Sequence, residues 1–368
     1  MNLQHIRLLL LLVLAWCSQS VAHYTDGARY AFSASAKEST IYVTDLASKT
    51  TVDQFSLSTQ PDYVAASLNL KALVVTHREE KALTLVDLNK KGFLQIPYSL
   101  EISPDVLIVS PLGETVAIYD ETAKKLEVHA LKRKDILLEL EEVSTSKDFT
   151  FNLDGSKLYW VDHTSGELRS VDLWSKQTSL RLTRDGDALS AVTRSIDGQL
   201  GFISDSSRNL VSVVDLSTMK ILKEIQVGAG PLRPWGTSDG QYMLVPNDND
   251  SSVTAISTFN LEVLYTVPGV NNTTSINPGW LDSNTALIGK DGKIEFIETS
   301  TGKKLASFDL DTTISDGLVT SDSKTLAISS TGGITFFDMR TSKLISSISD
   351  FPNDLGKASV AVSNNLCH

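Results

Sequence analysis

The stretch "VSVVDLSTMKILKEIQV", residues 211–227, contains two strand-like runs separated by a short polar turn. The first run is rich in valine and ends at Asp215, and the second starts at Lys220 and carries spaced isoleucine and valine residues. Short β-branched and apolar runs bounded by turn residues indicate β-strands. This strand, turn, strand unit is the one from which we predict the fold.

The unit recurs along the whole chain. Its first strand is repeated as "IYVTDL", "LTLVDL", "LEVHAL", "LRSVDL", "VSVVDL", "VTAIST", "IEFIET" and "ITFFDM". The fifth position of these motifs is occupied by Asp45, Asp87, Ala130, Asp172, Asp215, Ser257, Glu298 and Asp338. Successive positions are 40 to 43 residues apart. Such an even period is typical of a repeat architecture.

Each repeat also contains two earlier strands, for example "KLYWVDH" at 157–163. Asp-Gly pairs at 154–155, 197–198 and 239–240 lie between the first and second strands of their repeats, where a tight hairpin favours positive φ. The Asp that ends each "VDL" strand is expected to accept hydrogen bonds from backbone amides of the next turn. Four strands in about 42 residues form one antiparallel blade.

Eight such blades predict an all-β fold, a single eight-bladed β-propeller of four-stranded blades. The first repeat begins at "ARYAFSAS" (28–35) and lacks an innermost strand, whereas the chain ends with an extra one, "KASVAVSNN" (357–365). We therefore expect the C-terminal strand to complete blade 1 and close the ring, which pairs edges that would otherwise be exposed. This predicts one propeller domain over residues 23–368.

The N-terminal residues 1–22 have the features of a cleaved signal peptide: Arg7, nine apolar residues from Leu8 to Trp16, and small residues before His23. The apolar run is shorter than the roughly 20 residues that span a bilayer. We expect a periplasmic or secreted protein without membrane insertion. Lipidation at Cys17 is an alternative, although Trp16 stands where lipoproteins need a small residue.

Charge and cysteine content narrow the expected partners. Removal of residues 1–22 leaves 32 basic and 44 acidic residues, since Arg7 is lost, and a net charge of −12. Such a surface repels phosphate backbones, so nucleic acid is not an expected partner. Cys367 would be the remaining cysteine, so the mature chain cannot form an intramolecular disulfide.

The motifs "IYVTDLASKT" and "VSVVDLSTMKILKEIQVGAGP" resemble the YVTN-type propeller repeat of exported bacterial proteins, over residues 28–366. Relatives of that architecture include haem d1 domains, amine dehydrogenase heavy chains, lactonase-like propellers and periplasmic zinc metallochaperones. The resemblance implies the fold and export. It leaves the function open, because one fold carries many activities.

Candidate binding residues are expected on the face that carries the turns between second and third strands together with the connections between blades. In the connection "VGAGPLRPWGTSDG" (227–240), Arg233 and Trp235 are not explained by the repeat pattern. We expect both near the channel mouth as ligand or partner contacts. The other candidates on this face are Arg78, Asp120, Asp205 and Arg208.

Three histidines are candidate metal ligands. His77 and His163 end the second strands of blades two and four, and His23 would be the first residue after cleavage, with a free amine beside its imidazole. Zinc or copper would suit such ligands. Solvated histidines and a disordered lead-in before blade one are the structural alternatives.

The sequence has no nucleophile elbow, no His-Glu-x-x-His, no dinucleotide glycine motif and no phosphate loop. The leading hypothesis is an exported, non-catalytic binding protein for a small ligand, a metal ion or another exported protein. The first alternative is a periplasmic metal-binding protein or zinc or copper metallochaperone. The second is an enzyme of the lactonase or quinoprotein-subunit kind.

Overall fold

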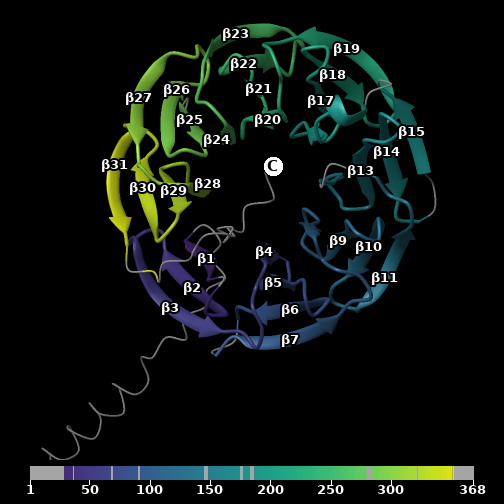
Figure 1. Ribbon diagram of the computed structural model, residues 1–368, viewed down its shortest axis with the longest axis vertical. Coiled ribbons are helices and arrows are strands. Elements are labelled where there is room, and N and C mark those ends of the chain that lie inside the picture. Colours follow the sequence, from purple (N-terminus) through teal and green to yellow (C-terminus); the bar gives the residue numbers. More distant parts are fainter. Residues whose placement is uncertain are drawn as a thin grey trace, which may run out of the picture.

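The computed structural model describes residues 29–351, except residues 36, 68, 90–91, 145–147, 175–176, 183–185, 280–283, 321 and 350. These residues form eight antiparallel sheets arranged as blades around one axis, so the predicted eight-bladed β-propeller is confirmed (Figure 1). The signal peptide, His23 and the expected closing strand at 357–365 lie outside the described residues. None of the described residues forms a helix with the length and hydropathy needed to span a membrane.

The strands follow one another from the inside to the outside of each blade. Blades 1 to 4 contain β1 (Tyr30–Ser35), β2 (Thr40–Asp45), β3 (Thr50–Ser56); β4 (Tyr63–Ser67), β5 (Ala72–His77), β6 (Ala82–Asp87), β7 (Leu94–Ser99); β8 (Val106–Val109), β9 (Thr115–Asp120), β10 (Lys125–Ala130), β11 (Asp135–Leu140); β12 (Thr150–Phe151), β13 (Lys157–Asp162), β14 (Glu167–Asp172), β15 (Gln177–Arg181).

Blades 5 to 8 repeat this order, with one short 3₁₀ helix, η1 (Gly186–Ala188), before blade 5. They contain β16 (Thr193–Arg194), β17 (Leu200–Asp205), β18 (Leu210–Asp215), β19 (Lys220–Gln226); β20 (Trp235–Gly236), β21 (Tyr242–Asn247), β22 (Ser252–Ser257), β23 (Val263–Pro268); β24 (Thr273–Pro278), β25 (Asn284–Gly289), β26 (Lys293–Glu298), β27 (Lys304–Asp309); β28 (Ile314–Val319), β29 (Thr325–Ser330), β30 (Gly333–Asp338), β31 (Lys343–Ile348).

The middle strands of each blade are largely buried because neighbouring blades cover both of their sides. In β18, the strand of the opening motif, every residue from Leu210 to Val214 is buried. The outer strand β19 is exposed except for Ile225. A strand packed on both sides reads as a continuous apolar run, whereas an outer strand keeps polar residues. The core therefore lies between blades.

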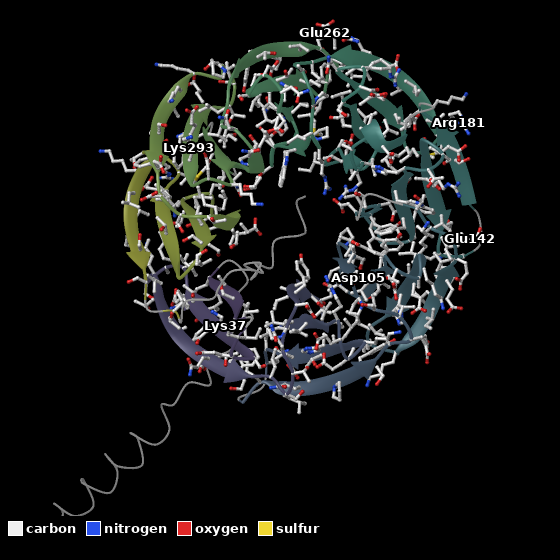
Figure 2. All side chains as sticks on the ribbon, in the orientation of Figure 1. Lys37, Asp105, Glu142, Arg181, Glu262 and Lys293 are labelled. Atoms are coloured by element: carbon white, nitrogen blue, oxygen red, sulfur yellow. The ribbon has the colours of Figure 1, made fainter. Side chains whose placement is uncertain are left out.

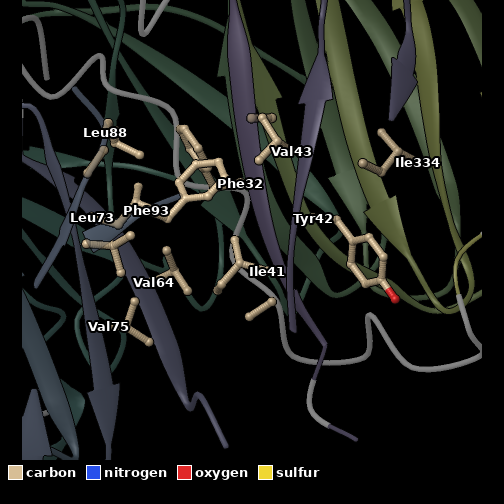
Figure 3. Close-up of a cluster of buried hydrophobic side chains, with 14 of the residues drawn as sticks. Phe32, Ile41, Tyr42, Val43, Val64, Leu73, Val75, Leu88, Phe93 and Ile334 are labelled. Atoms are coloured by element: carbon tan, nitrogen blue, oxygen red, sulfur yellow. The ribbon is translucent and has the colours of Figure 1, made fainter. Parts of the chain in front are cut away.

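Blade 1 has three strands within the described residues, whereas the other seven have four. Its side chains nevertheless join both neighbours in one buried cluster, with Phe32 and Ile41 of blade 1, Val75 of blade 2 and Ile334 of blade 8 (Figure 3). The Phe351 ring, which follows blade 8, packs edge-on against Tyr42 of β2 at 5.3 Å. The ring is thus closed by packing between the last and first blades.

Turn chemistry follows the sequence pattern. Asp215 Oδ1 accepts hydrogen bonds from the backbone N–H groups of Ser217 and Thr218 at 2.8 and 3.1 Å. Hydrogen bonds, foremost that of the Ser217 side chain, lower the pKa of Asp215 to about 2. Gly198 and Gly240 have φ of +75° and +70°, as expected for the Asp-Gly turns. The Asp that ends the strand and the glycine of the Asp-Gly pair therefore both stabilise backbone turns, as predicted.

Candidate functional site

The propeller has two functionally distinct faces. We call the face with the turns between second and third strands and the connections between blades the connection face. The opposite face, which carries the turns between first and second strands and those between third and fourth strands, is the turn face. This assignment follows from the antiparallel order of strands in each blade. The predicted binding residues within the described part of the chain belong to the connection face or to segments that lead into it, whereas His23 lies outside the described residues.

His77, a predicted metal ligand, is buried within blade 2 with 1% of its surface exposed. Its Nδ1 lies 2.9 Å from the Gln60 carbonyl oxygen and 2.9 Å from Thr59 Oγ1. Because a carbonyl only accepts, Nδ1 carries the proton, and the Thr84 hydroxyl, 2.8 Å from Nε2, donates to the other nitrogen. Both nitrogens are engaged within the protein, and the role of His77 as a metal ligand stays a prediction that would require one of these contacts to break.

His163, the second predicted metal ligand, is half-buried after β13. Its Nε2 is buried without a hydrogen-bond partner among the described residues. Burial lowers its pKa, with Asp187 and Asp162 opposing that effect, so the imidazole is neutral at pH 7. Blade 3 separates His163 from His77, and no three described His, Cys, Asp or Glu side chains lie close enough together to hold a metal. Metal binding by His77 or His163 stays a prediction.

The candidate carboxylates Asp120 and Asp205 end the second strands of blades 3 and 5, and both are bound by their own turns. Asp120 accepts backbone hydrogen bonds from Thr122 and Ala123 at 2.9 and 2.8 Å. Burial disfavours ionisation of Asp120, but backbone hydrogen bonds outweigh it and lower its pKa. The side chain therefore has the same turn-capping role as Asp215.

Asp205 and Arg208, both predicted contacts, pair with each other. Arg208 Nε donates to Asp205 Oδ2 at 2.6 Å, and the hydroxyl of Ser207 donates to Asp205 Oδ1 at 2.6 Å. Burial raises the pKa of Asp205, but the hydrogen bonds from Ser207 and Arg208 outweigh it and lower the pKa overall. Arg208 also donates to Glu224 at 2.9 Å. Asp205 and Arg208 therefore stabilise the turn between the second and third strands of blade 5.

Trp235 is half-buried in β20 and packs against the cluster between blades 6 and 7, which contains Leu244, Val253 and Leu287. Trp235 contributes to packing between blades, so less of its ring is available to a ligand or partner than its position in the sequence suggested.

Two predicted arginines bridge neighbouring blades and keep exposed surface. Arg78 Nε of blade 2 lies 3.1 Å from Asp105 Oδ1, in the connection to blade 3. Figure 2 places Asp105 toward the inside of the ring. Arg233, before β20, donates from Nη1 to Asp148 of the connection before blade 4 and from Nε to Thr193 Oγ1 of blade 5 at 3.1 Å. These pairs tie the inner parts of the blades together.

Arg233 has an unusual environment. Its side chain keeps 41% of its surface open to solvent, yet burial of the guanidinium lowers its pKa to about 10. The guanidinium is thus surrounded by protein atoms but still accessible to solvent. Nε and Nη1 have the partners named above, and Nη2 has no hydrogen-bond partner among residues 29–351 that the structure describes. The guanidinium is held in place and retains N–H donors that a ligand could use.

The turn face carries apolar side chains that the search for charged and metal-binding residues missed. The exposed apolar residues in its turns are Leu112, Leu153, Trp174, Ile196 and Phe259. Leu153 and Ile196 directly precede Asp-Gly pairs, where polar residues are usual in turns. Of these residues, Ile196 and Phe259 line one common groove.

No family model and no curated protein matches the chain. Solved structures share its shape. The chain is similar to the dihydro-heme d1 dehydrogenase NirN in complex with DHE, with a TM-score of 0.74 and 13% identity over 93% of this chain and 76% of that one. It is also similar to BamB from Moraxella catarrhalis, with a TM-score of 0.65 and 13% identity over 83% and 92% of the two chains.

A third similar structure is the C-terminal WD40 domain of Sif2, with a TM-score of 0.63 and 15% identity over 83% of this chain and 94% of that one. At these identities, the similarities establish the β-propeller fold alone. The YVTN repeat family is not among these findings, so membership in that family remains a prediction. The ligand of this chain has to be inferred from its own residues.

Proposed function

We propose that the protein is an exported binding protein whose connection face receives an anionic group of a small ligand or of another exported protein. The observation that carries this proposal is the Arg233 guanidinium, which is fixed by Asp148 and Thr193, open to solvent and in possession of unused donors. Arginine binds carboxylates and phosphates through paired N–H groups. Preorganised donors also lower the entropic cost of binding.

The NirN structure similar to this chain is a complex with DHE, which supports the idea that a propeller of this shape can hold a small molecule. The net charge of −11 disfavours an anionic ligand at long range, so recognition would depend on short-range hydrogen bonds from the Arg233 guanidinium.

The test is a thermal-shift screen of mature protein against small carboxylates and phosphates, followed by calorimetric titration of each hit. Arg233→Ala should abolish the stabilisation by the ligand, and Arg233→Lys should retain part of it. Arg133→Ala is the matched control, because Arg133 pairs with Asp135 on the turn face and is 63% exposed. Equal ligand affinity in Arg233→Ala and in the wild type would refute this site.

Export is tested separately by producing the full chain in a Gram-negative host and sequencing the N-terminus of the periplasmic fraction. We expect a chain that begins at His23. A chain retained in the cytoplasm with residues 1–22 intact would contradict export.

Metal binding is a second candidate function, favoured by the neutral His163 with its unpartnered Nε2 beside Asp187. His23, with its terminal amine, would add ligands from outside the described residues. Elemental analysis of untagged mature protein, with zinc and copper titrated back, tests it. Stoichiometric metal lost in His163→Gln would support a metal carrier, and a metal-free protein with weak binding would exclude it.

A further inference from the structure

A groove of about 480 Å³ lies on the turn face between blades 5 and 6. Its apolar lining comes from Ile196 and Leu200 of blade 5 and from Tyr242, Phe259 and Leu264 of blade 6. Its size falls within the roughly 300–1,000 Å³ of typical ligand pockets. It is distinct from the site at Arg233, which belongs to the connection face.

The floor of the groove is built by contact between consecutive turns. Ile196 lies against Gly240 of the next blade so closely that a Cβ at Gly240 would come within 2.3 Å of Ile196 Cγ2. Leu153 approaches Gly198 in the same way one blade earlier, at 3.0 Å. Apolar residues before the Asp-Gly pairs thus rest on the glycine of the following turn. This contact between consecutive turns occurs at both places, and at Gly240 it gives the floor of the groove a defined shape.

Phe259 forms one wall of the groove, and 92% of its surface is exposed. Its backbone is nevertheless fixed, since Thr258 donates from N–H to the Gln241 carbonyl at 3.0 Å and from its hydroxyl to the Gly240 carbonyl. Asn260 N–H donates to Ser257 Oγ at 3.2 Å. A large aromatic ring on a rigid turn can bind with little loss of conformational freedom. Aromatic residues are enriched in interfaces for this reason among others.

The border of the groove is acidic. Asp197 and Asp239 are exposed, and Oδ1 of each accepts a backbone hydrogen bond within its own turn, from Gln199 and Gln241 respectively. No ion pair involves either carboxylate in the part of the chain that the structure describes. The nearby cation Arg194 is buried and donates to backbone carbonyl groups. Arg194 attracts Asp197 and offsets part of its charge, so the two carboxylates and this one cation leave the border of the groove with a net negative charge.

From this combination we infer that the groove binds an extended segment of a partner protein in which an aromatic or aliphatic side chain stands beside lysine or arginine. The apolar side chain would fill the space between Ile196 and Phe259, and the cations would meet Asp197 and Asp239. A second copy of this chain is a poorer occupant, because two chains of net charge −11 repel each other. This inference is independent of the anionic site at Arg233.

The experiment measures fluorescence anisotropy of labelled synthetic peptides with mature protein in 150 mM salt. The probe peptide GKRLFLRKG carries both features, GKRSSSRKG lacks the apolar residues, and GDELFLEDG reverses the charge. We expect the probe to bind at least about tenfold more tightly than either comparison peptide. Comparable affinity of GKRSSSRKG or GDELFLEDG, or no saturable binding of the probe, would overturn the inference.

Variants locate the binding. Phe259→Ser should weaken the probe by about tenfold or more without loss of stability, since the ring is already exposed. Leu344→Ser, in the outer strand β31 and 51% exposed, is the matched control and should change the affinity less than about twofold. Arg233→Ala should have no effect, which separates this site from the proposed function. Equal weakening by Leu344→Ser, or self-association that Phe259→Ser abolishes, would overturn the inference.

Discussion

Substitution of Gly240 by alanine tests whether contact between consecutive turns shapes the turn face. Gly240 has φ of +70°, and a Cβ there would lie 2.3 Å from Ile196 Cγ2 and 3.3 Å from Ile196 Cβ. Because isoleucine is branched at Cβ, its Cγ2 cannot move without a change of χ1 or of the backbone. The added methyl group should therefore displace Ile196 from its packed position. The groove between blades 5 and 6, which we call the peptide groove, should lose its floor at the same time.

The expected cost has two parts. A left-handed backbone costs an alanine about 1–2 kcal/mol. Ile196 is 40% exposed, and full burial of an isoleucine is worth about 1.5–3 kcal/mol, so displacing it forfeits about 1–2 kcal/mol. Gly240→Ala should then lower the free energy of unfolding by about 2–4 kcal/mol.

The assay is urea unfolding with a built-in control for backbone strain. Gly92 has φ of +86° and open space where its Cβ would stand, so Gly92→Ala should cost only the backbone part, about 1–2 kcal/mol. In the Ile196→Ala background, Gly240→Ala should cost about 1–2 kcal/mol less than it does in the wild type, and this difference is the coupling energy between the two residues. Equal costs for Gly240→Ala and Gly92→Ala, with no coupling to Ile196, would refute the turn contact.

Two further predictions concern buried ionisable groups. Burial raises the pKa of Asp316 in the inner strand β28 to about 6, so its contribution to stability is complete below about pH 4 and is lost as pH rises through 6. Asp316→Asn should gain about 3 kcal/mol over the wild type between pH 4 and pH 7 in urea unfolding, and a difference independent of pH would contradict this. Glu127 is buried between Lys125 Nζ at 3.0 Å and His129 Nε2 at 2.8 Å, so Glu127→Ala should cost about 3–5 kcal/mol. Glu139→Ala removes a 52% exposed partner of Lys125 and should cost less than about 1 kcal/mol, and equal costs would contradict the burial argument.

The architecture was predictable because each blade repeats the same local chemistry. Apolar strands and short turns recur every 40 to 43 residues, with Asp-Gly hairpins in three repeats and Asp at the fifth motif position in five, and each feature acts within a few residues of its own position. Asp215 illustrates this, since the amides that it binds are two and three residues away. A structure specified by such short-range rules can be read from a single sequence. The number of blades then follows from the number of repeats.

The candidate site was harder to predict because side-chain partners come from neighbouring blades. Arg233 meets Asp148 across 85 residues and Thr193 across 40 residues. The period sets the angle between these blades but not the reach of their side chains. Asp120 and Asp205 have a turn-capping role that the sequence analysis did not assign to them, and their role as binding residues stays a prediction. They end strands before exposed turns, as Asp215 does, so the argument that made Asp215 a turn cap applied to them too.

The turn after the third strand shows how the sequence could have pointed to the peptide groove. In each blade, the position that Phe259 occupies in blade 6 corresponds to Ala47, Asn89, Lys132, Trp174, Ser217, Ser300 and Arg340. Where the preceding strand ends in Asp, the turn uses the backbone N–H of this position, as in the hydrogen bonds from Ser217 and Trp174 to their aspartates. The side chains of Ser217 and Asn89 add a second hydrogen bond, but Ala47 shows that the turn forms without one. The turn therefore does not require a particular side chain here, which explains the variety of residues found. An aromatic ring at such a position does not serve the fold, and its 92% exposure lowers solubility unless a partner covers it. In a propeller, the residues to examine first for binding are those that exceed what the repeated turn requires.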